Sequence, residues 1–242
     1  MKKALSLILA LVLCLSLCAC GGNQSSDPNP SAETQPSKED ILKEASDMNL
    51  VAAGKAFEEN KVNAQDTYYN KYYTIVGTVR QIESDEVIIN PINAVSGSAF
   101  SSASQCHVKL PVDEIKMLST FDVIKVCGKL TDFKKGYDNY TLTLDEAFYV
   151  DNTIVITAEI SDVNNYMGGK KSIVLRESAG NGSVFYEIVV AKSDAENSEE
   201  AEFMGTTYQI GDKVTFTGVL RNNPNMGSNY YDVVTVNTIS KN

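Results

Sequence analysis

The sequence predicts a mainly β protein with a smaller helical part, arranged as two tandem five-stranded barrels that follow short helices. Three observations predict this class. Apolar side chains recur at helical spacing over residues 37–71, they alternate with a period of two from residue 72 onward, and the order of strands repeats after residue 151. With 242 residues, the chain has room for two domains of about 100 residues beside a leader segment.

The first twenty-two residues are typical of an export signal. Two lysines precede a largely apolar run from Ala4 to Leu17, which is shorter than the ~20 residues that a membrane-spanning helix needs. The end of the run, Leu17-Cys18-Ala19-Cys20, resembles the lipobox of bacterial lipoproteins, in which the last cysteine is joined to diacylglycerol and the signal is cut before it. The resemblance implies that Cys20 is the lipidated first residue of the mature chain. The alternatives are a plain secretory signal or an uncleaved anchor, with Cys20 incidental.

These features divide the chain into four expected parts. Residues 1–19 are the signal peptide, 20–37 a flexible stalk, 38–150 the helices with the first barrel, and 151–242 the second barrel. The stalk is poor in large apolar side chains and rich in Asn, Ser and Pro, so it cannot bury enough surface to fold. The expected location is the outer side of the cell membrane, with the lipid as the membrane contact. The sequence leaves open whether the host has one membrane or two.

Helices are expected before the first barrel. Ser37 can cap a first helix whose opening turn contains Glu39 and Asp40. Apolar side chains then recur three or four positions apart at Leu50, Ala53 and Phe57.

Two sets of five strands follow. The first set is expected over residues 73–82, 86–92, 105–110, 122–130 and 140–150, with a helix over 111–121 that Pro111 opens. The second set is expected over residues 153–163, 171–177, 184–192, 212–220 and 230–239, with a helical or loop passage near 194–205.

The fourth and fifth strands of the two sets align at an offset of ninety residues. This offset places Asp122, Gly128 and the Asn139-Tyr140 pair on Asp212, Gly218 and the Asn229-Tyr230 pair. Such a shared frame indicates an internal duplication. Five strands with a helix between the third and fourth are the arrangement of the OB-fold, a small Greek-key barrel.

Short motifs over residues 50–90 carry a family resemblance. They are Leu50, Ala52, Ala53, Phe57-Glu-Glu-Asn60, Asn63-Ala64, Tyr68, Lys71, Tyr72 and Val76-Gly-Thr-Val79. In these residues the chain resembles the tRNA-anti-like family of exported bacterial OB-fold proteins, many of them lipoproteins. The resemblance implies a binding fold and supplies no catalytic residues.

Charge argues against a nucleic-acid partner. The chain has 21 basic and 31 acidic residues, whereas nucleic-acid binding depends on lysine and arginine displacing counterions from phosphates. An acidic run over residues 194–202 lacks the alternating ligands and central glycine of a calcium loop, which favours a solvated surface.

No catalytic, metal or cofactor motif is found. The sequence contains no GxSxG, GxxxxGK[ST], HExxH or GxGxxG pattern, and the single histidine, His107, has no cysteine or second histidine at ligand spacing. We therefore expect no enzyme activity, no metal and no cofactor. A pair of carboxylates that folding brings together is the one route to a hydrolase that the sequence leaves open.

Besides the expected lipidated Cys20, two cysteines remain after the signal, Cys106 and Cys127. Export would permit a disulfide between them, but both fall in expected strands, and the alternation of side chains leaves open whether they face each other.

The loops between the fourth and fifth strands are the candidate ligand-binding segments. Their candidate contact residues are Phe133, Lys134, Tyr137 and Tyr140 in the first barrel, and Tyr230 and Tyr231 in the second. Aromatic rings there could stack on a sugar or a base, and Lys134 could contact an anion. The alternative is that the tyrosines open the last strand and pack on its neighbour.

The sequence thus favours a lipid-anchored, extracytoplasmic binding protein that recognises a protein or another envelope component without catalysis. The alternative is an oligosaccharide or single-stranded nucleic-acid binder that uses these loops. The sequence leaves the oligomeric state of the protein open.

Overall fold

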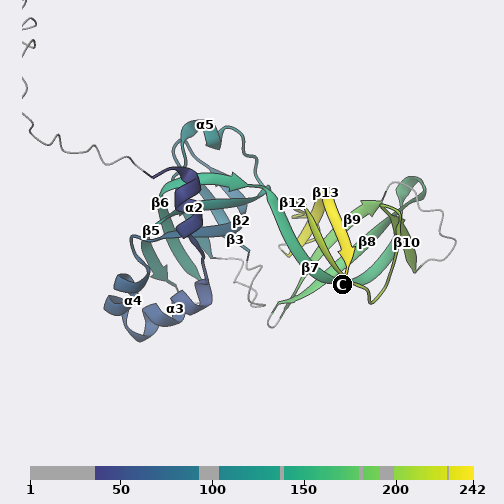
Figure 1. The fold of residues 1–242 in the computed structure, drawn as a ribbon, viewed down its shortest axis with the longest axis horizontal. Coiled ribbons are helices and arrows are strands. Elements are labelled where there is room, and N and C mark those ends of the chain that lie inside the picture. The colour runs from purple at the N-terminus through teal and green to yellow at the C-terminus, as the bar shows by residue number, and fades with distance from the viewer. Residues whose placement is uncertain (1–35, 93–103, 137–138, 180–181, 191–198, 228) are drawn as a thin grey trace, which may run out of the picture. The chain divides into compact units, whose positions relative to one another are not determined.

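The computed structural model describes residues 36–92, 104–136, 139–179, 182–190, 199–227 and 229–242 (Figure 1). The expected signal, stalk and Cys20 lie outside these residues, apart from the last residues of the stalk. Among the described residues, no helix has the length and apolar character needed to cross a membrane.

Three short helices and a two-residue strand precede the first barrel. They are α2 (Lys38–Glu44), β1 (Ser46–Asp47), α3 (Leu50–Glu59) and α4 (Lys61–Tyr68). The Ser37 cap is confirmed, because Asp40 N donates to Ser37 Oγ at 3.2 Å. Asparagine side chains cap α3 and α4 in the same way.

The first barrel has the OB-fold topology. It consists of β2 (Tyr72–Ile82), β3 (Val87–Pro91), β4 (Gln105–Val108), β5 (Val123–Lys135) and β6 (Tyr140–Asp151), with the short helix α5 (Val112–Ile115) between β4 and β5. The strands pair in the order β2-β3-β4-β6-β5, and a β2–β5 pairing closes the sheet. Within these five strands only β4 and β6 pair in parallel.

The second barrel repeats this topology. It consists of β7 (Thr153–Tyr166), β8 (Lys170–Ala179), β9 (Gly182–Val190), β12 (Lys213–Asn222) and β13 (Tyr230–Lys241), with a single 3₁₀ turn, η1 (Met167–Gly169), between β7 and β8. The strands close in the order β12-β13-β9-β8-β7, and β9 and β13 are the parallel pair. The prediction of two tandem five-stranded barrels is confirmed.

A hairpin stands in the second barrel where the first has α5. It consists of β10 (Glu200–Phe203) and β11 (Thr206–Gln209), over part of the passage expected to be helical or loop. Ala201 and Tyr208 point into the core, with 0% and 1% of their surfaces exposed. Met204 and Gly205 form the turn with φ of 50° and 74°, as a two-residue hairpin requires.

The ninety-residue offset holds in the strands. β5 and β12 begin at Val123 and Lys213, and β6 and β13 begin at Tyr140 and Tyr230. The shared glycines have one structural role, because each lies at a register shift where the fifth strand crosses closely. A Cβ atom at Gly128 would lie 2.7 Å from Ala147 Cβ, and one at Gly218 would lie 2.3 Å from the Thr235 carbonyl oxygen. Neither position has room for a side chain.

Each barrel has its own apolar core. Fully buried side chains in the first barrel include Val79, Ile89, Val108, Leu130, Leu142 and Leu144. Those in the second include Ile160, Ile173, Leu175, Ile188 and Phe216. The outer faces of the strands are left to carry polar and aromatic side chains.

Candidate binding faces of the two barrels

Phe133 is a core residue and not a loop residue. The sequence predicted that this strand ends at Leu130. Instead β5 continues to Lys135, which pairs with Tyr140. The Phe133 ring stacks on Phe57 of α3 at 4.5 Å between ring centres, and 3% of the residue is exposed. Only residues 136–139 remain for the loop. A ligand cannot reach Phe133 in this arrangement.

The other predicted residues of this loop differ in exposure. The Tyr140 ring lies 5.5 Å from Phe133 and packs on the core of the first barrel, beneath α3. Lys134 is exposed, and its Nζ atom lies 2.6 Å from Asp132 Oδ2, a hydrogen bond that raises the pKa of Lys134. Tyr137 lies outside the described residues.

Cys106 and Cys127 are free, buried thiols, so the possible disulfide is not formed. Cys106 on β4 lies opposite Leu142 of β6, whereas Cys127 on β5 lies opposite Phe148 of the same strand. Strand β6 therefore separates the two thiols laterally, and six residues along a strand add roughly 20 Å. A disulfide requires Cα atoms within about 7 Å of each other.

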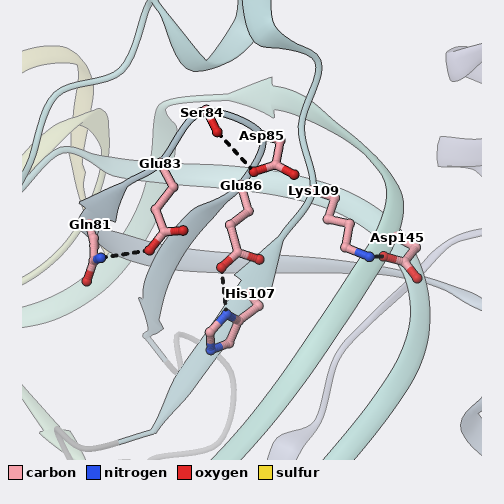
Figure 2. Close-up of polar contacts among 8 residues, drawn as sticks. All are labelled: Gln81, Glu83, Ser84, Asp85, Glu86, His107, Lys109 and Asp145. Carbon is pink, nitrogen blue, oxygen red and sulfur yellow. Dashed lines mark hydrogen bonds and ion pairs between the residues drawn. The ribbon is translucent and has the colours of Figure 1, made fainter.

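The first barrel presents a charged face, which Figure 2 shows. The turn between β2 and β3 contributes Glu83, Asp85 and Glu86, and the His107 Nδ1 atom on β4 lies 3.1 Å from Glu86 Oε1. Beside them Lys109 Nζ lies 2.8 Å from Asp145 Oδ1.

Hydrogen bonding between that lysine and Asp145 lowers the pKa of the carboxyl and raises the pKa of Lys109. Two more acidic side chains of the turn accept from neutral donors, Glu83 from Gln81 at 2.8 Å and Asp85 from Ser84 at 3.3 Å.

In the second barrel the two predicted tyrosines point in opposite directions. Tyr231 is buried, 5% exposed, and its ring stacks on Tyr186 at 5.8 Å, so it is a core residue. Tyr230 lies on the outer face, where its ring stacks on Phe185 of β9 at 6.1 Å with 23° between the planes. Of these two tyrosines, Tyr230 is the one that a ligand can contact.

The hydroxyl of Tyr230 donates to Glu187 Oε2 at 3.2 Å. Partial burial raises the pKa of Tyr230, and the charge of Glu187 raises it further. Asp232 and Asp162 raise it further through their negative charges.

An open pocket of about 280 Å³ lies beside the aromatic pair. Its lining residues are Ser183, Phe185, Met226, Gly227, Asn229 and Tyr230. Main-chain bonds fix both ends of the loop before β13, because Phe185 N donates to Asn229 O at 2.9 Å and Asn223 N donates to Tyr230 O at 2.8 Å.

The strand register arranges this outer face in two rows. The first row runs from Arg176 on β8 through Phe185 on β9 to Tyr230 on β13. The second row crosses the same strands one step along and contains Val174, Glu187 and Asp232, with Asp162 of β7 opposite Val174. We call the surface formed by the following residues the aromatic-acidic face: Asp162, Arg176, Phe185, Glu187, Tyr230 and Asp232.

The family model for tRNA_anti-like proteins matches residues 1–139, more than half of the chain. The chain belongs to the tRNA_anti-like family. No curated protein matches it at a significant level. A solved structure described as "Structural mimicry for functional antagonism" aligns with 72% of this chain and 93% of its own, at 10% identity and a TM-score of 0.23. At that score the alignment carries no argument.

For this tRNA_anti-like protein, sequence reasoning missed Phe185, Glu187 and Asp232. The alternation in the expected strand over residues 184–192 places Phe185 and Glu187 on the face opposite Tyr186. The sequence could therefore predict that these two side chains share a face. The contact with Tyr230 depends on the parallel pairing of β9 with β13, which local sequence does not reveal.

Proposed function

We propose that this tRNA_anti-like protein is a lipid-anchored binding protein outside the cytoplasm, which recognises a protein or another envelope component without catalysis. The lipobox-like sequence that ends at Cys20 supports the anchor. The family and the OB-fold support a binding role.

The stacked rings of Phe185 and Tyr230 indicate where the proposed binding site lies. OB-folds bind through the face of their second and third strands and the loop between the fourth and fifth. In the second barrel these are β8, β9 and the loop over residues 223–229, and the pair lies among them with an open pocket beside it. Aromatic rings that remain half-exposed there offer contact area to a partner.

An oligosaccharide is the second candidate ligand for the same face. Stacked rings beside the hydroxyl of Ser183 and the amide of Asn229 suit a sugar ring and its hydroxyl groups. A single-stranded nucleic acid fits less well, because Glu187 and Asp232 lie where its phosphates would approach.

Thermal unfolding tests the binding role. Residues 37–242 form a compact unit and can be heated with cell-wall fragments, oligosaccharides, basic and acidic peptides and single-stranded DNA. A ligand at a hundred times its dissociation constant should add about 2.7 kcal/mol to the free energy of unfolding and raise the Tm by several degrees. The Tyr230→Ala variant should lose that shift. A shift that survives in Tyr230→Ala places the site elsewhere, and substrate turnover would contradict the absence of catalysis.

Mass spectrometry tests the anchor. The full chain, expressed in a bacterium, should yield an N-terminal peptide that begins at Cys20 and carries diacylglycerol, and it should fractionate with membranes. The Cys20→Ala variant should lose the lipid. An unmodified Cys20 in a chain cut elsewhere would show a plain secretory signal, and a chain that still begins at Met1 would show an uncleaved anchor.

A further inference from the structure

We infer that the ligand of the aromatic-acidic face is a basic segment of another protein, held by a lysine or arginine side chain that lies over Phe185 and Tyr230 and reaches the carboxylates of Glu187 and Asp232. The inference rests on the proposed function and names the chemistry of its ligand.

The spacing of the face fits one cationic side chain. Residues two apart on a strand lie about 7 Å apart, and neighbouring strands lie about 4.8 Å apart. Glu187 follows Phe185 by two positions on β9, and Asp232 follows Tyr230 by two positions on β13. Since β9 and β13 are parallel neighbours, the two rings form one row and the two carboxylates form the next. A cation on the rings is therefore within reach of both carboxylates.

The carboxylates of this face are oriented by neutral donors. The Tyr230 hydroxyl donates to Glu187 at 3.2 Å, and the Asn223 side-chain amide donates to both oxygens of Asp232 at 3.0 and 3.1 Å. Asp162 accepts from the main-chain N of Val163. None of these donors neutralises the charge, and within the described part of the chain no ion pair involves Glu187, Asp232 or Asp162.

Aromatic rings beside negative charges favour a cation over a neutral or anionic group. The face of an aromatic ring attracts lysine and arginine side chains, and the attraction adds to that of the nearby carboxylates. Met226, 62% exposed at the edge of the pocket, offers an adaptable apolar surface for the aliphatic part of such a side chain.

Arg176 gives the face a direction. It lies opposite Phe185 in the aromatic row, on the side away from Tyr230, and its Nε atom donates to Ser183 Oγ at 2.9 Å. Its positive charge repels a cation from that end of the row. The ligand cation is therefore favoured on the Tyr230 side, next to Glu187 and Asp232.

Peptide binding tests the inference. A fluorescent peptide of alternating lysine and glycine, and a matched peptide with glutamine in place of lysine, are titrated with residues 37–242 at low and physiological salt. The lysine peptide should bind at least tenfold more tightly than the glutamine peptide, with an affinity that falls as salt rises. Glu187→Gln and Asp232→Asn should each weaken binding about threefold to fivefold, the size expected for one exposed ion pair.

Two further variants make the test specific. Arg176→Gln should strengthen binding of the lysine peptide about threefold, because it removes a repulsive charge. Asp66→Asn, an exposed carboxylate of α4, changes the net charge of the chain as Glu187→Gln does and should leave binding unchanged. Both face substitutions keep an oxygen that accepts the bond from Tyr230 or Asn223, so the fold is retained.

The results separate this inference from the proposed function. A neutral oligosaccharide whose binding depends on Tyr230 but not on Glu187 would overturn the basic ligand and leave the binding site in place. Equal weakening by Asp66→Asn and Glu187→Gln would reduce the attraction to net charge and also overturn the inference. Binding by either peptide that is insensitive to Tyr230→Ala would overturn the site itself.

Discussion

Two carboxylates of the first barrel and two on the outer face of the second are held in different ways. In the first barrel lysine side chains pair with two carboxylates: Lys109 pairs with Asp145, and Lys129 pairs with Glu146 at 2.9 Å. On the outer face of the second barrel, hydroxyl and amide groups hold Glu187 and Asp232 in place. Lysines thus neutralise two carboxylates of the first barrel, whereas neutral donors hold Glu187 and Asp232 of the second.

The two tyrosines ninety residues apart show a second difference. Tyr140 and Tyr230 both open the last strand of their barrel, but α3 covers Tyr140, whereas Tyr230 stands on an open face. The loop before Tyr230 spans residues 223–229, against 136–139 in the first barrel. The helix α3 and the shorter loop therefore leave Tyr140 packed against the core, whereas the equivalent Tyr230 stays on an open face.

Substitution of Phe133 is expected to change stability more than any other test of the difference between the two barrels. Phe133→Ala should lower the free energy of unfolding by about 3–5 kcal/mol, because it empties a buried ring position that Phe57 covers. Asn223→Ala, at the position ninety residues later, should cost only about 1 kcal/mol. Urea unfolding measures both. Equal losses would show that α3 does not make the first copy a core position.

The tyrosine pair should divide stability from binding. Tyr140→Ala is expected to lower the free energy of unfolding by about 2–3 kcal/mol through lost packing on Phe133. Tyr230→Ala should lower it by about 1 kcal/mol and abolish ligand binding. Thermal unfolding with and without ligand separates the two effects. A Tyr140→Ala variant that is stable but cannot bind would move the site to the first barrel.

The shared glycines should respond alike. Gly128→Ala and Gly218→Ala are each expected to cost about 1–3 kcal/mol, because the added methyl group meets the crossing strand. Ala147→Gly in the first variant should recover part of the loss, since Ala147 Cβ is the atom approached. Insensitivity of one barrel would show that the duplication has not kept this crossing.

Two carboxyl groups should give opposite pH dependence. Burial raises the pKa of Glu177, which accepts from the Tyr186 hydroxyl at 2.8 Å, so its charged form destabilises the fold as pH rises above the normal carboxyl range. Glu177→Gln should raise the Tm by a few degrees at pH 7 and have little effect near pH 4.

Asp145 has a lowered pKa, so its ionised form contributes stability that is lost as pH falls through that pKa. Asp145→Asn should therefore lower the Tm at pH 7, and the difference should vanish in acid. Melting curves from pH 3 to 8 measure both changes. If the Tm of both variants changed with pH in the same direction, the raised pKa of Glu177 or the lowered pKa of Asp145 would be contradicted.

The smallest effect is expected for reducing agent. Burial raises the pKa of Cys127 to about 11 and raises the pKa of Cys106 further, and the two thiols lie far apart in the first barrel. Reductant should leave the Tm unchanged, and a thiol reagent should react only after unfolding. A fall in Tm under reduction would mean that the thiols are joined in solution.

The sequence could predict what depends on local alternation and on the repeat. The order of the strands along the chain and the Ser37 cap follow from residues close together in the sequence, and the offset that joins Tyr140 to Tyr230 follows from the repeat. The burial of Phe133 could not be predicted, because its cover, Phe57, lies seventy-six residues earlier. The same holds for the separation of Cys106 from Cys127, which β6 imposes, and for the stacking of Phe185 on Tyr230, which needs the parallel pairing of β9 and β13.

The position of β13 as the closing strand has a consequence for the order of synthesis. β13 pairs with both β12 and β9, so the second barrel cannot close until residues 230–241 have emerged, whereas the first is complete in sequence once Asp151 has emerged. Domains generally fold from the N-terminal end as the chain appears. Tyr230 and Asp232 belong to that strand, so the aromatic-acidic face is assembled only when the second barrel closes. A partner encountered earlier finds no site to bind.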